Sequence, residues 1–189
     1  MMVQTTEEVT VPSLDRPPTP DPYTLLPQVP AFTLVSDTFA PGARVPDETT
    51  NTPAGRNLSP HLAWSGFPDE TASFAVTCFD VDAPGPSGWW HWTLLDLPPT
   101  ITELAAGAGA AGSDLLPSTV VTLRGDDGIA AYVGAAPPPG DREHRYFYAV
   151  HALDVPSMGL EADTMPGAAS MMLVFHTIAR AVLVATFQR

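Results

Sequence analysis

The stretch SFAVTCFDVDAPGPSGWWHWTLLDL, residues 73–97, decides the fold class. Its two ends, residues 73–81 and 89–97, are apolar at both alternating sets of positions and rich in Val, Thr, Phe and Trp. Such runs are typical of central β-strands that are covered on both faces. The segment therefore predicts two buried strands of a sheet.

Similar runs outside this stretch predict a mainly β protein. Short apolar runs bounded by Pro, Gly and Asp indicate a first strand near residue 31 and later strands at residues 118–124, 129–134 and 144–155. Residues 103–116 contain several alanines, but their three glycines favour a loop over a short helix.

Only the segment after Pro166 predicts a clear helix, because proline suits the first helical turn. Apolar residues recur there at helical spacing: Met171, Phe175, Ile178 and Val182. We expect this stripe to face the core. His176 should lie among these residues as a hydrogen-bonded structural histidine.

The length of 189 residues fits one domain with a sizeable core. Residues 1–30 hold seven prolines and few bulky apolar residues, which predicts an extended or disordered arm. Residues 31–189 are then a single domain.

The formal net charge of −13 limits the classes of partner, and all eight basic residues are arginines. Duplex DNA and anionic membrane surfaces would repel such a body, so we expect neither nucleic-acid binding nor stable membrane association. A few arginines, histidines or backbone N–H groups can still hold a small anion locally.

Cysteine usage and the N-terminal residues favour a cytoplasmic location. The single cysteine, Cys78, permits no internal disulfide and should be a buried small hydrophobe. The first residues lack the basic and apolar regions of a secretory signal, and no apolar run reaches the roughly twenty residues that span a bilayer.

Polar residues interrupt the apolar strands at three places. Asp80 follows apolar residues on one face of its strand, where a carboxylate must be paired or hydrogen-bonded. Asp82 precedes Ala83–Pro84, a candidate for a cis bond, and can anchor the turn. His91 stands between two tryptophans and lies a few residues after Asp80. This position suits either a structural histidine or a site that His91 shares with Asp80.

The third place is the start of the strand at residue 144. His144 and Tyr146 share one face, whereas Arg145 points the other way and should form a structural ion pair. An aspartate, two histidines and a tyrosine would make a small polar pocket. Protonated imidazoles could donate to a phosphoryl group, and Asp80 could accept from an ammonium or hydroxyl.

The same side chains permit a second interpretation, since two histidines and a carboxylate also bind iron or zinc. However, the sequence has no H-E-x-x-H, no G-x-S-x-G and no glycine-rich loop with a lysine. These absences weaken the enzyme hypothesis and leave it open.

Three blocks of sequence resemble the phosphatidylethanolamine-binding protein family, in its bacterial Raf-kinase-inhibitor-like branch. NLSPHLAWSGFP (57–68) resembles its N-x-S-P-x-L-x-W-x-G-x-P block, and CFDVDAPGPSGWWHW (78–92) its D-P-D-A-P and W-x-H elements. YVGAAPPPGDREHRYFYAVHAL (132–153) resembles its G-P-x-P-P-x-G-x-x-x-H-R-Y signature. The resemblance covers residues 31–189.

This chain departs from the family pattern at three points. Val81 replaces a proline, and Ala135–Ala136 replaces a common glycine-proline pair. Bacterial members often carry T-R-N-D-Y/F-G where this chain has LRGDDG (123–128), in a loop that borders the family's pocket. The ligand preference is therefore open.

The resemblance implies two packed antiparallel sheets in a Greek-key-like arrangement with peripheral helices. It also implies a pocket for phosphate, acetate, cacodylate or phosphorylethanolamine. We expect neither a metal nor a cofactor. By motif position the ligand-binding residues would be Asp80, Trp89, His91, Pro138, His144 and Tyr146. Asp82 and Arg145 would support them.

The expected function is non-enzymatic binding of a small phosphoryl or carboxylate ligand, which modulates a partner such as a protein kinase or serine protease. The alternatives are a metal-dependent or His/Asp acid–base enzyme acting on a phosphoester, and a structural protein with a vestigial pocket. A homodimer is favoured, with the apolar residues 171–187 as part of its interface.

Overall fold

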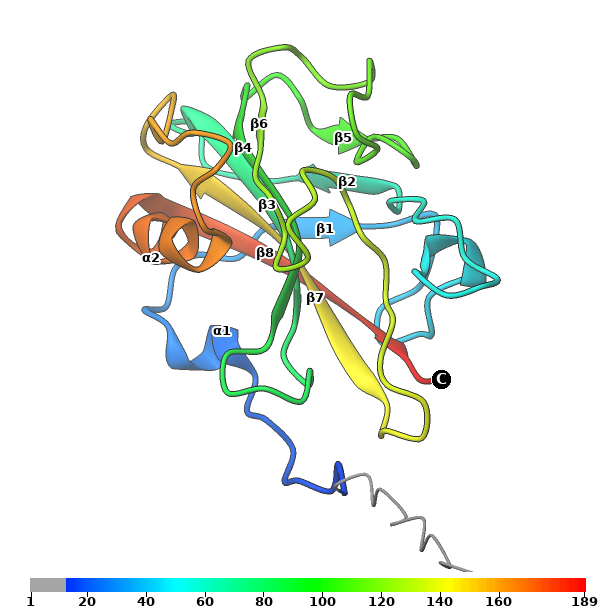
Figure 1. Cartoon of the computed structure of the whole chain (residues 1–189). Coiled ribbons are helices and arrows are strands. Elements are labelled where there is room, and N and C mark those ends of the chain that lie inside the picture. Colours follow the sequence, from blue (N-terminus) through cyan, green and yellow to red (C-terminus); the bar gives the residue numbers. More distant parts are fainter. Residues whose placement is uncertain (1–12) are drawn as a thin grey trace, which may run out of the picture.

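Two antiparallel sheets form the body of the protein within residues 13–189, the part of the chain that this computed structural model describes (Figure 1). The larger sheet has the strand order β6-β4-β3-β7-β8: Val121–Thr122, Trp89–Leu97, Ser73–Asp80, His144–Leu153 and Thr177–Phe187. The smaller has the order β1-β2-β5: Thr33–Val35, Leu62–Ser65 and Glu103–Leu104. The helices are α1 (Pro22–Leu25), the 3-10 turn η1 (Asp47–Thr49) and α2 (Pro166–His176).

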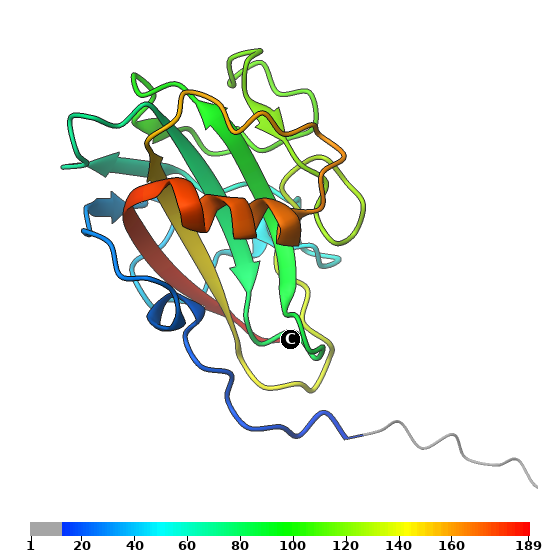
Figure 2. The same ribbon diagram turned by 90° about the vertical axis from the view of Figure 1, so that its left-hand side faces the viewer.

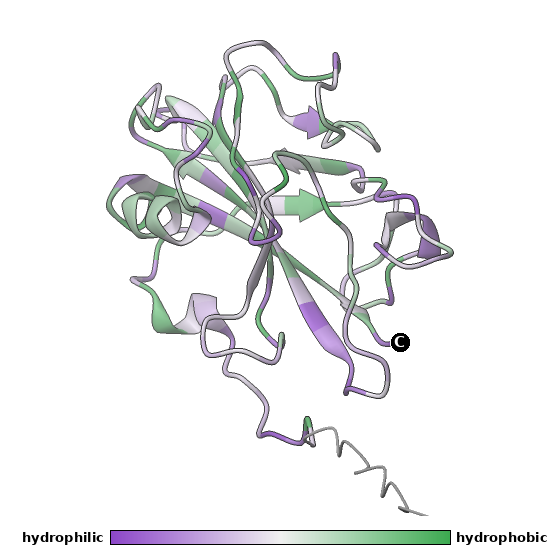
Figure 3. Cartoon of the chain, viewed as in Figure 1, coloured by the Kyte–Doolittle hydropathy of each residue, from purple (hydrophilic) through white to green (hydrophobic). Residues whose placement is uncertain are grey.

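The main core lies between the two sheets, and β3 contributes to it from one face. Phe74, Val76 and Cys78 belong to this cluster, whereas Ala75 packs on the other face in a smaller cluster with Leu173 of α2. The prediction of strands covered on both faces is therefore confirmed for β3. In Figure 3 hydrophobic colour follows much of the strands, and the start of β7 is hydrophilic.

The prediction of one long C-terminal helix is wrong beyond His176. Residues Thr177–Phe187 form β8, which pairs antiparallel with the whole of β7. Pairing along a complete strand edge outweighs the helical spacing of Ile178 and Val182, since β-branched residues also suit a sheet. Figure 2 shows α2 crossing the outer face of the larger sheet before the chain returns as β8.

The side chains of α2 also differ from the predicted stripe. Met171 and Phe175 are 61% and 71% exposed, and Ala169 and Leu173 face the sheet instead. His176 is hydrogen-bonded as predicted, but its Nδ1 pairs with Asp154 near the surface at 2.9 Å rather than inside the core.

Other segments show how far the strand predictions held. His144–Leu153 form β7 within the strand predicted at 144–155, but only Val121–Thr122 of the strand predicted at 118–124 form one, β6. The loop predicted at residues 103–116 is correct except that Glu103–Leu104 form β5.

The strand predicted at residues 129–134 does not form. The backbone N–H groups of this segment donate to two different parts of the chain: Tyr132 N–H to Gly109 O, and Val133 N–H to His91 O. No continuous ladder of strand hydrogen bonds therefore forms. The Ala83–Pro84 bond is trans.

The described part of the N-terminal arm, residues 13–30, runs beside the larger sheet and includes the single helical turn α1 (Figures 1 and 2). Tyr23 packs its ring 6.0 Å from that of Phe147, and Pro30 O accepts the backbone N–H of Arg180. Residues 1–12 of the predicted arm lie outside the described residues. No helix in residues 13–189 is both long and apolar enough to cross a bilayer.

Candidate functional site

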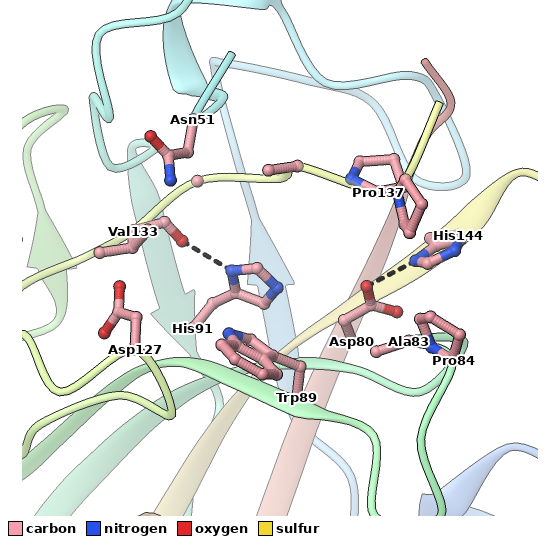
Figure 4. Close-up of a pocket in the computed structure, with 13 residues that line it drawn as sticks. Asn51, Asp80, Ala83, Pro84, Trp89, His91, Asp127, Val133, Pro137 and His144 are labelled. Atoms are coloured by element: carbon pink, nitrogen blue, oxygen red, sulfur yellow. Dashed lines mark hydrogen bonds and ion pairs between the residues drawn. The ribbon is translucent and has the colours of Figure 1, made fainter. Parts of the chain in front are cut away.

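A cavity of about 270 Å³ lies where the inner strands β3, β4 and β7 of the larger sheet end or begin (Figure 4). Asp80 ends β3, whereas Trp89 begins β4 and His144 begins β7. Because β3 runs antiparallel to both neighbours, its end lies beside their beginnings: Asp80 is opposite Trp89, the first residue of β4, and Tyr146, the third residue of β7. This pairing brings together residues that lie far apart in the sequence.

Five of the six predicted ligand-binding residues line this cavity: Asp80, Trp89, His91, Pro138 and His144. Tyr146 lies behind His91, with the two rings edge-to-face at 5.3 Å, and does not line it. The Tyr146 hydroxyl is buried without a hydrogen-bond partner among the described residues. Burial and the nearby charge of Asp80 raise the pKa of Tyr146, so the hydroxyl stays protonated.

His144 is held between two carboxylates. Its Nδ1 lies 2.7 Å from Asp80 Oδ2 and its Nε2 lies 2.9 Å from Asp141 Oδ2. Burial alone would lower the pKa of His144, but the hydrogen bonds and charges of the two aspartates raise it overall. The ring is therefore a cation whose two N–H groups are both used inside the protein.

The arm continues this row of alternating charges. Arg16 donates to both carboxylate oxygens of Asp141 at 2.9 Å and also to the backbone oxygen of Asp82. These contacts hold the pKa of Asp141 well below its usual range. A line of charges thus runs from Asp80 through His144 and Asp141 to Arg16, and it fixes the Asp80 carboxylate at the cavity wall.

Asp82 and Arg145 lie outside the cavity and form an ion pair. Arg145 donates from Nε to Asp82 Oδ2 at 2.7 Å, and Arg142 donates to Asp82 Oδ1 at 2.6 Å. Burial would raise the pKa of Asp82, but Arg145 outweighs it and the pKa is lowered. This pair closes the turn after β3 against the start of β7.

His91 offers the free imidazole nitrogen of the site. Its Nδ1–H donates to Val133 O at 2.8 Å, and its Nε2 points into the cavity (Figure 4). Burial lowers the pKa of His91, and the charge of Asp80 offsets this only in part. The ring is therefore neutral near pH 7, and it gains a proton at lower pH or beside an anion.

Asn51 and Asp127 also line the cavity, and the reasoning from the residues missed both. The Oδ1 of Asn51 accepts from Asn57 at 3.4 Å, which leaves its amide N–H₂ directed toward the cavity (Figure 4). Asp127 belongs to the loop at residues 123–128, whose departure from the family pattern was the one signal pointing to it.

Gly134 brings the Asn51 loop against the cavity wall. Its N–H donates to Asn57 Oδ1 at 2.9 Å, and a Cβ at this position would lie 1.9 Å from Thr49 O. Only glycine permits this close approach of two backbones. Ala83, Pro84, Val133, Ala136 and Pro137 complete the wall.

Comparison with known proteins identifies the family of this fold and site. The family model for phosphatidylethanolamine-binding protein matches residues 35–188. The chain belongs to the phosphatidylethanolamine-binding protein family. The resemblance predicted from the three sequence blocks is thereby confirmed, and so is the mainly β fold of two antiparallel sheets with a helix near the C-terminus.

Bacterial relatives support this assignment along most of the chain. The Escherichia coli protein YbhB is 43% identical over 133 residues, which are 70% of this chain and 83% of YbhB. The crystal structure of E. coli YbcL superposes with a TM-score of 0.80 at 36% identity, covering 84% of this chain and 98% of YbcL. CT736 from Chlamydia trachomatis gives a TM-score of 0.70 at 29% identity, with the same two coverages. The protein is thus a ligand-binding protein of this family's fold.

Proposed function

We propose that the cavity beside Asp80 binds a small compound with a phosphoryl group and an ammonium group, such as phosphorylethanolamine, without converting it. The observation that carries this proposal is the free His91 Nε2 facing a cavity bordered by two carboxylates, Asp80 and Asp127. The phosphoryl oxygens would accept from protonated His91 and from the Asn51 amide. The ammonium group would donate to Asp127 or Asp80.

The alternative, a metal-dependent or His/Asp acid–base enzyme, has less support from this geometry. Both nitrogens of His144 are bonded to aspartates, so this ring has no lone pair for a metal and no free N–H for a substrate. Acid–base catalysis by two histidines would have to begin by breaking those bonds. Modulation of a protein kinase or serine protease, a cytoplasmic location and a homodimer stay predictions from the sequence.

The test is a calorimetric titration with phosphorylethanolamine at pH 5.5 and 7.5. We expect saturable binding that is tighter at pH 5.5, because anion binding favours protonated His91, whose pKa lies below the usual value. The substitution His91→Ala removes a charge-assisted hydrogen bond of about 1.5–3 kcal/mol, so Kd should rise roughly ten- to hundred-fold at pH 5.5. Its pH dependence should shrink to that of the phosphoryl group, which itself titrates near pH 6.

His176→Gln is the matched control, because this histidine pairs with Asp154 and neither residue lines the cavity. Its Kd should equal that of the unmodified protein. No saturable heat in the unmodified protein, or an unchanged Kd in His91→Ala, would contradict the proposal. Release of inorganic phosphate, followed by ³¹P NMR, would favour the enzyme instead.

A further inference from the structure

A second cavity, of about 370 Å³, lies on the outer face of the larger sheet. Residues of α2 line it on one side, and residues of the arm and α1 line it on the other. Figure 2 shows α2 and the arm on this face of the sheet. Its floor comes from β3, β7 and β8, through Thr77, His151 and Arg180. No residue lines both this cavity and the one beside Asp80.

Arg180 is a buried cation without a counter-ion in the described part of the chain. It is 8% exposed, and no carboxylate within residues 13–189 lies within salt-bridge distance of it. Its Nε has no hydrogen-bond partner, and its guanidinium lies 5.1 Å from the centre of the Tyr23 ring. By contrast, Arg16, Arg142 and Arg145 each pair with an aspartate. An unpaired charge at this depth is costly, so the floor of the cavity favours an anion.

His151 places a hydrogen-bond acceptor beside this cation. His151 and Arg180 are direct partners across β7 and β8, and both line the cavity. The Thr177 hydroxyl donates to Leu173 O at 2.6 Å, so it must accept from His151 Nδ1–H at 3.2 Å. The Nε2 of His151 is then a bare acceptor, and it is buried with no partner among the described residues. Burial and the charge of Arg180 lower the pKa of His151 to about 3, which keeps the ring neutral.

The walls of the cavity are largely apolar. Tyr23 and Leu26 come from the arm, Phe79 and Trp90 from the sheet, and Leu173 and Val174 from α2. Apolar walls with a few convergent polar groups are typical of small-molecule sites, whose volumes are roughly 300–1,000 Å³. The polar floor offers one cationic donor and one neutral acceptor, and the walls offer contact to a hydrocarbon or aromatic tail.

We propose that this second cavity binds a small carboxylate that carries an apolar tail and a hydroxyl group next to the carboxylate. The carboxylate accepts from the guanidinium of Arg180, and the hydroxyl donates to Nε2 of His151. The tail lies against Trp90 and the α2 side chains. A phosphoryl compound without a tail would leave the apolar walls wet, which separates this ligand class from that of the first cavity.

Titration calorimetry of the full chain with 2-hydroxyoctanoate, octanoate and 1-octanol tests the proposal. The hydroxy acid should bind most tightly, octanoate more weakly and the uncharged alcohol most weakly. Arg180→Gln should weaken binding of both acids at least about ten-fold and bring them close to the alcohol, because the charge-assisted bond is lost. His151→Leu should remove the difference between the two acids.

A folding check on Arg180→Gln and two further variants, Ser170→Phe and Arg44→Gln, keep the test decisive. Arg180→Gln removes an unpaired buried charge, so its fold should survive, and circular dichroism checks this. Ser170→Phe fills the cavity from its partly exposed rim on α2 and should abolish binding of both acids. Arg44→Gln is the matched control, because Arg44 pairs with Asp47 at the surface. Absence of saturable heat with either acid, or equal affinity in Arg180→Gln, would overturn the proposal.

Discussion

At the scale of single residues, the site depends on how one histidine is protonated. His144 donates from both ring nitrogens to buried aspartates, and this arrangement exists only while the ring is charged. The pKa of His144 is raised in the folded protein, whereas the unfolded chain has the ordinary value near 6.5. The contribution of His144 to the free energy of unfolding is therefore complete below about pH 6.5. It is lost as the pH rises through the pKa of His144 in the folded protein.

We expect the free energy of unfolding to fall as the pH rises above 6.5 in the unmodified protein, and to change less in His144→Gln. At pH 6 the variant should be less stable by about 3 kcal/mol, because two buried carboxylates lose their cation. Urea denaturation across this range measures both effects. His91 and His151 have lowered pKa values, so their contributions vary only below pH 6.5 and leave this window clear. Parallel pH profiles of the two proteins would contradict the assignment of His144 as a cation.

The site residues that could be predicted from the sequence are polar groups inside apolar strands, whereas those that were missed lie elsewhere. Asp80 and His91 are polar groups inside apolar strands, where burial demands a partner, so their position signals a site. Asn51 and Asp127 come from polar loops in which an asparagine or aspartate is ordinary. Arg16 was missed because its contact with Asp141 joins residues 125 positions apart.

At the scale of elements, the position of the η1 loop depends on a glycine rather than on hydrophobic packing. Gly134 lies against Thr49 and Thr50, and its N–H is held by Asn57. This contact places Asn51 over the cavity. The position of this loop therefore depends on the backbone at residue 134.

Gly134→Ala should destabilise the protein by about 2 kcal/mol or more, because the Cβ would overlap the backbone of Thr49. It should also weaken phosphorylethanolamine binding, since Asn51 must shift. Gly85→Ala is the control, because a Cβ at Gly85 meets no atom within 4 Å and its φ is not positive. Urea denaturation and calorimetry measure the two effects. Equal stability of the two alanine variants would show that the loop does not depend on this contact.

The prediction of the C-terminal segment failed at the same scale, for a reason that local spacing does not contain. Residues 166–182 satisfy helical spacing throughout, but from Thr177 the chain lies beside the free edge of β7. Ten residues of β7 find partners in β8, so long-range pairing decides where the helix ends. The strands β3 and β4 could be predicted because being apolar on both faces is itself a local pattern.

At the scale of the whole molecule, the arm is attached to the body by specific polar contacts as well as by packing. Arg16 holds Asp141, and Thr19 O accepts from Arg145. Tyr23 lies against Phe147 and the Arg180 guanidinium, and burial raises its pKa to about 12.

Arg16→Met should lower the free energy of unfolding at pH 7 by about 2 kcal/mol, because it leaves the buried Asp141 with one cation fewer. The pKa of Asp141 is lowered chiefly by Arg16, so this stabilisation is present above about pH 4 and is lost as the pH falls through the folded value. The acid limb of a thermal-stability profile should therefore be shallower in the variant.

Arg56→Met is the matched control, since the Arg56–Glu48 pair is 3.8 Å long and largely exposed, and such pairs contribute about 0–1 kcal/mol. An Arg16→Met protein as stable as this control would mean that the arm is held by packing alone.

The contacts of the arm bear on where the folded unit begins. The family match starts at residue 35, yet Arg16 anchors the charge row behind the first cavity and Tyr23 and Leu26 wall the second. A chain truncated at the family boundary would keep the larger sheet but would lose most of β1 from the smaller one. It would also expose the Asp141 carboxylate and open the second cavity along one side. Choosing a domain boundary by family alignment would thus remove a structural part of both sites, and binding assays on such a fragment would describe a different protein.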